Sequence, residues 1–172
     1  MRRSIAAWLL CLLSFAASGA GASEESTQER RVPLEFGPRG HLVVPARING
    51  HEVFLVVDTG ASATVIDSGV ARSLGLSTDA QGATTDMGAG SAGIQVLSSP
   101  GNRFVLAGTV DDNFLLRILD LGHVVRALSH EGRPIAGVVG KDWLMRHGAV
   151  IDYARRSLHV TWPNGQNGDG GN

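Results

Sequence analysis

The segment that most constrains the fold is a pair of β-rich runs joined by a turn dipeptide. Residues 42–48 and 53–57 are rich in valine, leucine and isoleucine, and Asn49-Gly50 stands between them. Asparagine and glycine readily adopt the positive φ angles of a type I′ turn, so this dipeptide is a strong local signal for a β-hairpin. The pattern predicts two antiparallel strands, the second of which leads directly into polar residues.

That second strand ends at a carboxylate. Phe54 to Val57 is an uninterrupted apolar run, typical of a strand buried on both faces, and Asp58-Thr59-Gly60 follows at once. Because a lone buried charge is unfavourable, carboxylates in such places are commonly paired, neutralised or used in chemistry. The triplet is a candidate catalytic corner. A structural aspartate, or a fragment of a calcium site, is the alternative interpretation.

Two later blocks strengthen the catalytic interpretation. Residues 136–144 contain two valines and a glycine ahead of a short predicted helix, and residues 149–160 have the pattern of a closing hairpin. Together with the Asp-Thr-Gly-Ala-Ser block at 58–62, they resemble the single-domain, retropepsin-like aspartic proteases of a bacterial secreted or periplasmic type. The resemblance covers roughly residues 42–162. It implies a mostly β domain, a retropepsin-like barrel or sandwich with one or two short helices.

The resemblance also implies roles for individual residues. Asp58 would be the catalytic acid, and Leu144 would fill the core. The residues that would support the active site are Thr59, Gly60, Ser62 and Gly140. The implied substrate is an extended peptide or protein segment that adds to the enzyme as a strand.

The chemistry of peptide hydrolysis requires two acids. One ionised carboxylate takes a proton from water, and one protonated carboxyl polarises the scissile carbonyl. Since the chain offers one credible catalytic acid, we expect a symmetric homodimer in which Asp58 of each subunit shares a proton with its counterpart. No metal or other cofactor is expected, because none of the six histidines forms a recognised ligand spacing.

A glycine-rich segment follows the candidate catalytic corner. Residues 88–93 match the dinucleotide-binding pattern G-x-G-x-x-G, but that pattern requires a strand before it and a helix after it, and the sequence predicts neither. The resemblance favours a mobile flap near residues 84–95, with Gly88, Gly90 and Gly93 lowering the barrier to opening. An ordinary surface loop is the alternative.

The ends of the chain predict export. Residues 1–22 have a basic start, about 13 apolar residues and a small-residue end, the layout of a secretory signal that is too short to span a bilayer. We expect a signal peptide at 1–22, a flexible leader at 23–31, the protease domain at 32–162 and a disordered tail at 163–172. The predicted location is periplasmic or secreted, without a stable membrane span after cleavage.

Charge and cysteine content exclude several functions. Without residues 1–22 the chain has 13 basic and 16 acidic residues, a net charge of about −3, so no basic patch argues for nucleic acid. The only cysteine, Cys11, lies in the expected signal peptide, so we expect no disulfide framework and no cysteine nucleophile.

Several local predictions complete the pattern. Strands are expected at 63–66 and 114–119, and a helix at 68–74 capped by Asp67. Residues 94–97 and 104–106 flank Pro100-Gly101-Asn102, which predicts a further hairpin. Asp111, Asp112 and Asp120 are interpreted as acids of a solvated turn and a sheet edge, and residues 109–135 have no secure counterpart in compact family members.

Two functions other than proteolysis fit the same sequence. A non-catalytic periplasmic module could hold peptides in the same cleft, although binding alone gives no reason for a buried acid. A purely structural β domain of an envelope complex is the other alternative.

Overall fold

The computed structural model describes residues 27–37, 39–77, 79–86, 94–129 and 132–163. The expected signal peptide at 1–22 and most of the expected tail lie outside these residues. The chain is mostly β, as predicted. Its elements are β1 (Thr27–Pro33), β2 (Glu35–Phe36), β3 (Leu42–Ile48), β4 (His51–Val57), β5 (Val65–Asp67), α1 (Ser68–Ala71), β6 (Asp79–Asp86), β7 (Ile94–Leu106), β8 (Thr109–Leu119), α2 (Gly122–Leu128), β9 (Ile135–Val139), α3 (Lys141–Arg146), β10 (Val150–Asp152) and β11 (Ser157–Pro163).

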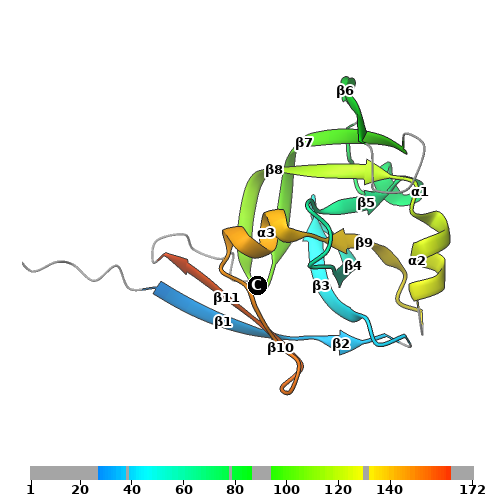
Figure 1. Ribbon diagram of the computed structural model, residues 1–172. Helices are drawn as coiled ribbons and strands as arrows, with labels where there is room; N and C mark the ends of the chain where they lie inside the picture. The colour runs from blue at the N-terminus through cyan, green and yellow to red at the C-terminus, as the bar shows by residue number, and fades with distance from the viewer. Residues whose placement is uncertain (1–26, 38, 78, 87–93, 130–131, 164–172) are drawn as a thin grey trace, which may run out of the picture.

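Most strands belong to one sheet that closes into a barrel (Figure 1). The strand order is β2-β3-β4-β9-β5-β8-β7-β6, and an additional pairing of β3 with β7 closes the ring. β4 and β9 run parallel, with Val56 opposite Val138 and Val57 opposite Val139. Because parallel neighbours end on the same side, the residues that follow β4 and β9 meet at one edge of the barrel.

The predicted hairpin of β3 and β4 is confirmed. Ile48 pairs with His51, and the two turn residues have the positive φ angles of a type I′ turn, 51° at Asn49 and 88° at Gly50. β4 is a core strand, since Leu55 is fully buried and Val56 is 7% exposed. The strand therefore carries its apolar run into the barrel wall and ends at Asp58.

The hairpin predicted around Pro100-Gly101-Asn102 is wrong. β7 continues through these residues, and both of its halves pair with β8, with irregular register between Ser99 and Phe104. Gly101 has a φ of 79°, and the Asn102 side chain donates to the Ser99 carbonyl oxygen at 2.6 Å. The turn-type residues thus form a bulge within one long strand and not a chain reversal.

The terminal segments form a second, three-stranded sheet in the order β1-β11-β10 (Figure 1). The closing hairpin of β10 and β11 was predicted, but residues 27–31 were assigned to a flexible leader and instead form most of β1. The charged side chains of Glu29, Arg30 and Arg31 are exposed, whereas Val32 packs against the core. Polar composition is compatible with an edge strand, because only part of its surface is covered.

The main core is formed by buried residues of the barrel strands together with residues of α1, α3 and β11. Trp143 is fully buried, its indole ring packs edge-on against Phe104 at a centroid distance of 6.2 Å, and Leu144 beside it is 6% exposed. The sequence did not predict α2, which lies on the barrel surface near the start of β9 (Figure 1). Among the described residues, no helix is long and apolar enough to cross a membrane.

Candidate active site

Asp58 lies at the barrel edge where β4 and β9 end. Its backbone N–H donates to the Val139 carbonyl oxygen at 3.1 Å, which extends the parallel pairing by one residue. The Ala61 N–H then donates to the Asp58 carbonyl oxygen at 3.2 Å and turns the chain. The backbone of Asp58 is therefore fixed on both sides, and its side chain is half-buried.

The glycine two residues later holds the carboxylate. The Gly60 N–H donates to Asp58 Oδ1 at 2.8 Å, and a Cβ atom at position 60 would lie 3.1 Å from the same oxygen. A larger residue would crowd the carboxylate, so glycine suits this approach. Thr59 and Ser62 are both exposed on the loop.

Gly140 packs directly against the loop that follows Asp58. A Cβ atom at Gly140 would lie 2.5 Å from the Ala63 carbonyl carbon, closer than real Cβ contacts allow. The adjacent Lys141 N–H donates to the Ala61 carbonyl oxygen at 2.9 Å. The turn between β9 and α3 thus packs against the loop that follows Asp58, and only glycine fits at position 140.

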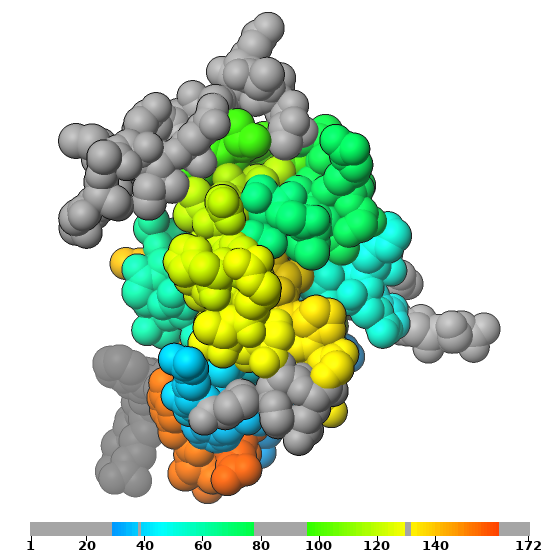
Figure 2. Space-filling view, turned by 90° about the vertical axis from the view of Figure 1, so that its right-hand side faces the viewer, coloured from blue at the N-terminus to red at the C-terminus, as the bar shows by residue number. Residues whose placement is uncertain are grey.

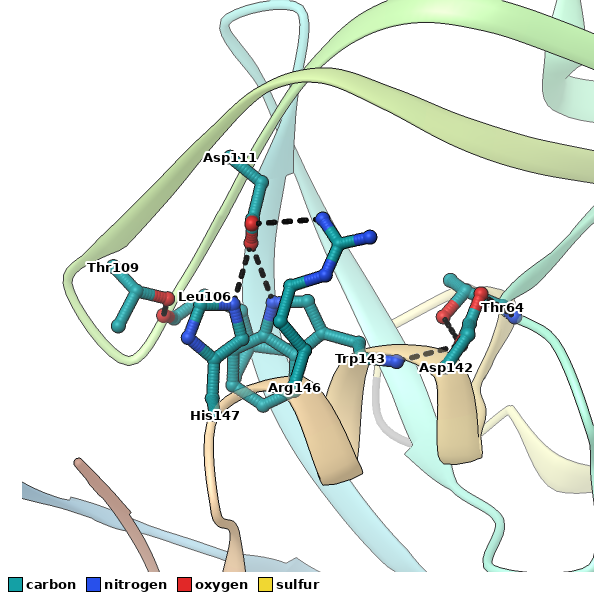
Figure 3. Close-up of polar contacts among 8 residues, drawn as sticks. All are labelled: Thr64, Leu106, Thr109, Asp111, Asp142, Trp143, Arg146 and His147. Carbon is teal, nitrogen blue, oxygen red and sulfur yellow. Dashed lines mark hydrogen bonds and ion pairs between the residues drawn. The ribbon is translucent and has the colours of Figure 1, made fainter. Parts of the chain in front are cut away.

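A side-chain pair that the sequence analysis missed fixes the far end of the loop (Figure 3). Thr64 is fully buried and makes two hydrogen bonds to Asp142: Oγ1 donates to Oδ1 at 2.8 Å and the backbone N–H donates to Oδ2 at 2.9 Å. The Trp143 N–H also donates to Asp142 Oδ1, at 2.8 Å. Asp142 therefore lies in the first turn of α3, accepts from an N–H of that turn and ties the helix to the loop.

Asp111 was interpreted as an acid of a solvated turn, and this is wrong. Its side chain is only 9% exposed and faces the side chains of Trp143, Arg146 and His147 (Figure 3). Trp143 Nε1 donates to its carboxylate at 2.9 Å, His147 Nε2 lies 2.8 Å from it, and Arg146 lies 3.3 Å from it. Burial raises the pKa of Asp111, but these partners outweigh burial and hold the pKa below its usual value of 3.8. The cluster attaches α3 to β8.

Asp67 occupies the predicted N-cap position of α1 but does not cap that helix with its side chain. The carboxylate is buried, 6% exposed, and its Oδ1 accepts a hydrogen bond from the Leu121 N–H at 2.8 Å. The predicted helix of 68–74 is also shorter, with α1 ending at Ala71. The Asp67 carboxylate thus accepts a hydrogen bond at the start of α2 and does not cap α1.

Two cavities adjoin the loop after Asp58. The larger, which we call the outer cavity, has a volume of about 630 Å³ and includes Gly60, Ser62 and Asp142 in its lining. The smaller, which we call the apolar pocket, has a volume of about 310 Å³. Among the described residues, Asp58 is the one ionisable residue in its lining. The residues that line both cavities are Ala61, Val65 and Leu119. The two spaces therefore meet beside the loop that carries Asp58.

The predicted flap glycines, Gly88, Gly90 and Gly93, lie outside the described residues. The described strands on either side of them, β6 and β7, pair antiparallel, with Asp86 opposite Ile94. Val96 of β7 lines the outer cavity. The segment that contains the three glycines thus connects β6 to β7, and β7 contributes to the lining of the outer cavity.

A second polar group in the terminal sheet has the connectivity of a serine triad. Ser157 Oγ lies 3.0 Å from His159 Nε2, and His159 Nδ1 lies 2.9 Å from Glu29 Oε1. Ser157 is only 4% exposed and belongs to β11, which is paired on both edges. A nucleophile must reach its substrate, so we interpret this group as support for the pairing of β1 with β11.

Comparisons with known proteins point in one direction. A family model described as "Aspartyl protease" matches residues 44–143, which include Asp58, Thr64 and Gly140. The UBA domain-containing protein Mud1 of Schizosaccharomyces pombe (strain 972 / ATCC 24843) is 32% identical over 132 residues. That match covers 74% of this chain and 35% of Mud1, so the chain spans about a third of the length of this curated relative.

Two solved structures share the fold. A retropepsin-like aspartic protease from Rickettsia conorii aligns with a TM-score of 0.52 at 20% identity, covering 80% of this chain and 94% of that one. The retroviral protease-like domain of Ddi1 from Leishmania major aligns with a TM-score of 0.50 at 22% identity, covering 74% and 90%. At these identities the matches show the fold, which is the retropepsin-like barrel that the sequence predicts.

Proposed function

The chain belongs to the aspartyl protease family, and from this membership we propose that it is an endopeptidase that hydrolyses peptide bonds with Asp58 as its catalytic acid. The observation that carries the proposal is the placement of the Asp58 carboxylate. It is half-buried, held by the Gly60 N–H, and lines the apolar pocket, which meets the outer cavity at the loop that follows Asp58. An acid held in this way is oriented before a substrate arrives.

Catalysis by this site would require a second copy of Asp58. Two other acids near the loop, Asp67 and Asp142, already accept backbone hydrogen bonds, from Leu121 and from Thr64 and Trp143. We therefore propose a homodimer in which the two Asp58 carboxyls lie about 3 Å apart, share one proton and activate a water molecule. Such a two-fold interface is isologous, so each subunit contributes the same residues.

The exposed residues of the loop are assigned supporting roles in this dimer. Thr59 would contact its counterpart across the two-fold axis, and Ser62 would support the loop from the wall of the outer cavity. An extended peptide would lie along the outer cavity beneath a flap that contains Gly88, Gly90 and Gly93. The antiparallel arms β6 and β7 support this assignment, because a hairpin is the natural connection between them.

Export is a further part of the proposal. It rests on the basic, apolar and small-residue layout of residues 1–22. Sequencing the N-terminus of the protein recovered from the periplasm or the medium tests it, and a start at Ser23 is expected. Recovery of the full-length chain in the cytoplasm alone would contradict it.

The function itself is tested by cleavage of an unfolded protein at mildly acidic pH. Wild-type protein should cleave the substrate, a statine-type inhibitor should block cleavage, and Asp58→Asn should abolish it. Asp112→Asn is the matched control, because it removes an exposed acid on β8 that pairs with Arg103. Equal cleavage by wild type and Asp58→Asn would contradict the proposal. Peptide binding without turnover at any acidic or neutral pH would favour the non-catalytic binding module.

A further inference from the structure

The helix that the sequence did not anticipate, α2, is anchored at both ends. At its start, the Leu121 N–H donates to the buried Asp67 carboxylate at 2.8 Å. At its end, His41 Nε2 lies 3.1 Å from the Leu128 carbonyl oxygen, and Ser129 Oγ accepts from the Ile135 N–H at 2.9 Å. These contacts tie one short helix to β5, to the residue before β3 and to β9. α2 is thus a fixed wall of the barrel surface (Figure 2, yellow).

The inner face of α2 is apolar. It covers β4, which leads to Asp58, and the neighbouring strands β3 and β9. Val125 is 9% exposed and packs with Val43, Val56 and Ile135 in a hydrophobic cluster separate from the main core. Charged and small residues occupy the outer face, where His123, Arg126 and Ala127 are exposed. Between the inner face and the sheet, the packing leaves the apolar pocket of about 310 Å³.

The lining of this pocket combines apolar side chains with one carboxylate. The residues contributed by α2 and its flanks are Leu121, Val124, Val125 and Leu128. Those contributed by the sheet and the loop are Val56, Asp58, Ala61, Val65, Leu119, Ile135, Gly137 and Val138. Of the described residues in this lining, Asp58 is therefore the one that carries a charged group, and the others are apolar.

The size of the pocket indicates what it holds. Ligand pockets span about 300 to 1,000 Å³, so this space of about 310 Å³ is at the lower end of that range and has room for one large side chain. A large aliphatic or aromatic side chain would lose its contact with water there. An acidic side chain would be repelled by Asp58 and would leave its own charge without a partner.

We propose that α2 completes a subsite for a large apolar side chain of the substrate, next to the peptide bond that the water activated by Asp58 attacks, and that Val124 determines the size of the side chain accepted. This inference rests on the proposed peptide hydrolysis at Asp58. Val124 is the natural determinant because it lines the pocket and is only partly buried, whereas Val125 is engaged in the packing of the helix. The subsite gives residues 109–135 a role in selecting substrates.

Binding of two statine-type peptides tests the subsite without requiring turnover. The peptides differ only in the side chain next to the statine unit, isobutyl in one and methyl in the other, and fluorescence anisotropy measures their dissociation constants. Wild type should bind the isobutyl peptide on the order of 10- to 100-fold more tightly, as expected for burial of three further carbon atoms. Val124→Phe, which fills the pocket, should reduce this ratio to about 3-fold or less.

Matched variants separate the subsite from general effects on the helix. Ala127→Phe places the same ring on the exposed face of α2 and should keep the wild-type preference. Val124→Ala, which enlarges the pocket, should shift the preference toward a benzyl side chain. A wild type that binds the two peptides equally or binds neither, or a Val124→Phe protein that keeps the full preference, would overturn the subsite.

A parallel cleavage assay distinguishes the failure of the subsite from the failure of the proposed function. Selective binding by a wild type that never cleaves a peptide would contradict hydrolysis while the subsite stands. Cleavage without any preference for a large apolar residue would contradict the subsite while hydrolysis stands.

Discussion

Thr64 and Asp142 lie 78 positions apart in the chain and make two hydrogen bonds to each other, of 2.8 and 2.9 Å. The pair joins the end of the loop that carries Asp58 to the first turn of α3. Since Thr64 is fully buried, its hydroxyl and N–H find their hydrogen-bond acceptor in Asp142 and not in water. The position of the candidate catalytic loop is thus coupled to the stability of α3.

Removing one partner of this pair should destabilise the protein. Asp142→Ala leaves the Thr64 hydroxyl and N–H buried without an acceptor, so we expect a loss of about 2 to 4 kcal/mol in the free energy of unfolding. Asp142→Asn keeps one acceptor oxygen and should lose less. Urea unfolding measures both values. Equal stability of Asp142→Ala and wild type would show that the pair does not hold the loop.

Gly140→Ala should displace the loop that follows Asp58. The added methyl group would overlap the Ala63 carbonyl, and we expect a destabilisation of about 2 kcal/mol or more together with a loss of peptide cleavage. Gly122→Ala is the control, because the nearest atom there is the flexible end of the Arg126 side chain at 3.1 Å. Thermal unfolding and a cleavage assay of both variants would expose the difference, and similar behaviour of the two would argue against a tight fit at Gly140.

The Asp111 cluster predicts acid sensitivity. The pKa of Asp111 is lower in the folded protein than its usual value of 3.8, so the unfolded chain takes up a proton first as the pH falls. The stabilisation by this carboxylate is therefore complete above about pH 4 and is lost below it, as the pH passes through the pKa of the folded state. Melting temperatures from about pH 2.5 to about pH 6 should show a steeper acidic decline for wild type than for Asp111→Asn. Parallel curves would contradict the assignment.

Features that depend on neighbouring residues were predictable from the sequence. Asn49-Gly50 specifies its hairpin because the two residues themselves adopt the required φ angles. The apolar run before Asp58 indicates a core strand, because a continuous run of apolar residues is typical of a strand that is buried on both faces. The placement of Asp58 at the end of a core strand follows from these two local signals.

Features that depend on distant contacts were not predictable. Asp111 is buried because α3, more than 30 positions later, brings Trp143 and His147 over it. Pro100-Gly101-Asn102 forms a bulge because β8 pairs with β7 on both sides of it, whereas the same residues in isolation favour a turn. The helix α2 is short, and its N-cap residue Leu121 has no capping side chain. Its start is held by Asp120, which accepts from the Gly122 N–H at 3.1 Å, and by the distant Asp67 of β5.

The proposed dyad makes activity depend on assembly. If each subunit supplies one Asp58, specific cleavage activity should fall on dilution in proportion to the fraction of dimer. Sedimentation velocity at the assay concentrations gives that fraction independently. Full specific activity in a sample that sediments as a monomer would exclude a catalytic site shared between subunits.

The distance between the two Asp58 carboxylates in a crystal structure with a bound statine-type peptide tests the central claim most directly. The account predicts two subunits related by a two-fold axis, with the nearest carboxylate oxygens about 3 Å apart and both in contact with the statine hydroxyl. A peptide bound to a single subunit, with the Asp58 carboxylates of neighbouring chains beyond hydrogen-bond reach, would contradict it.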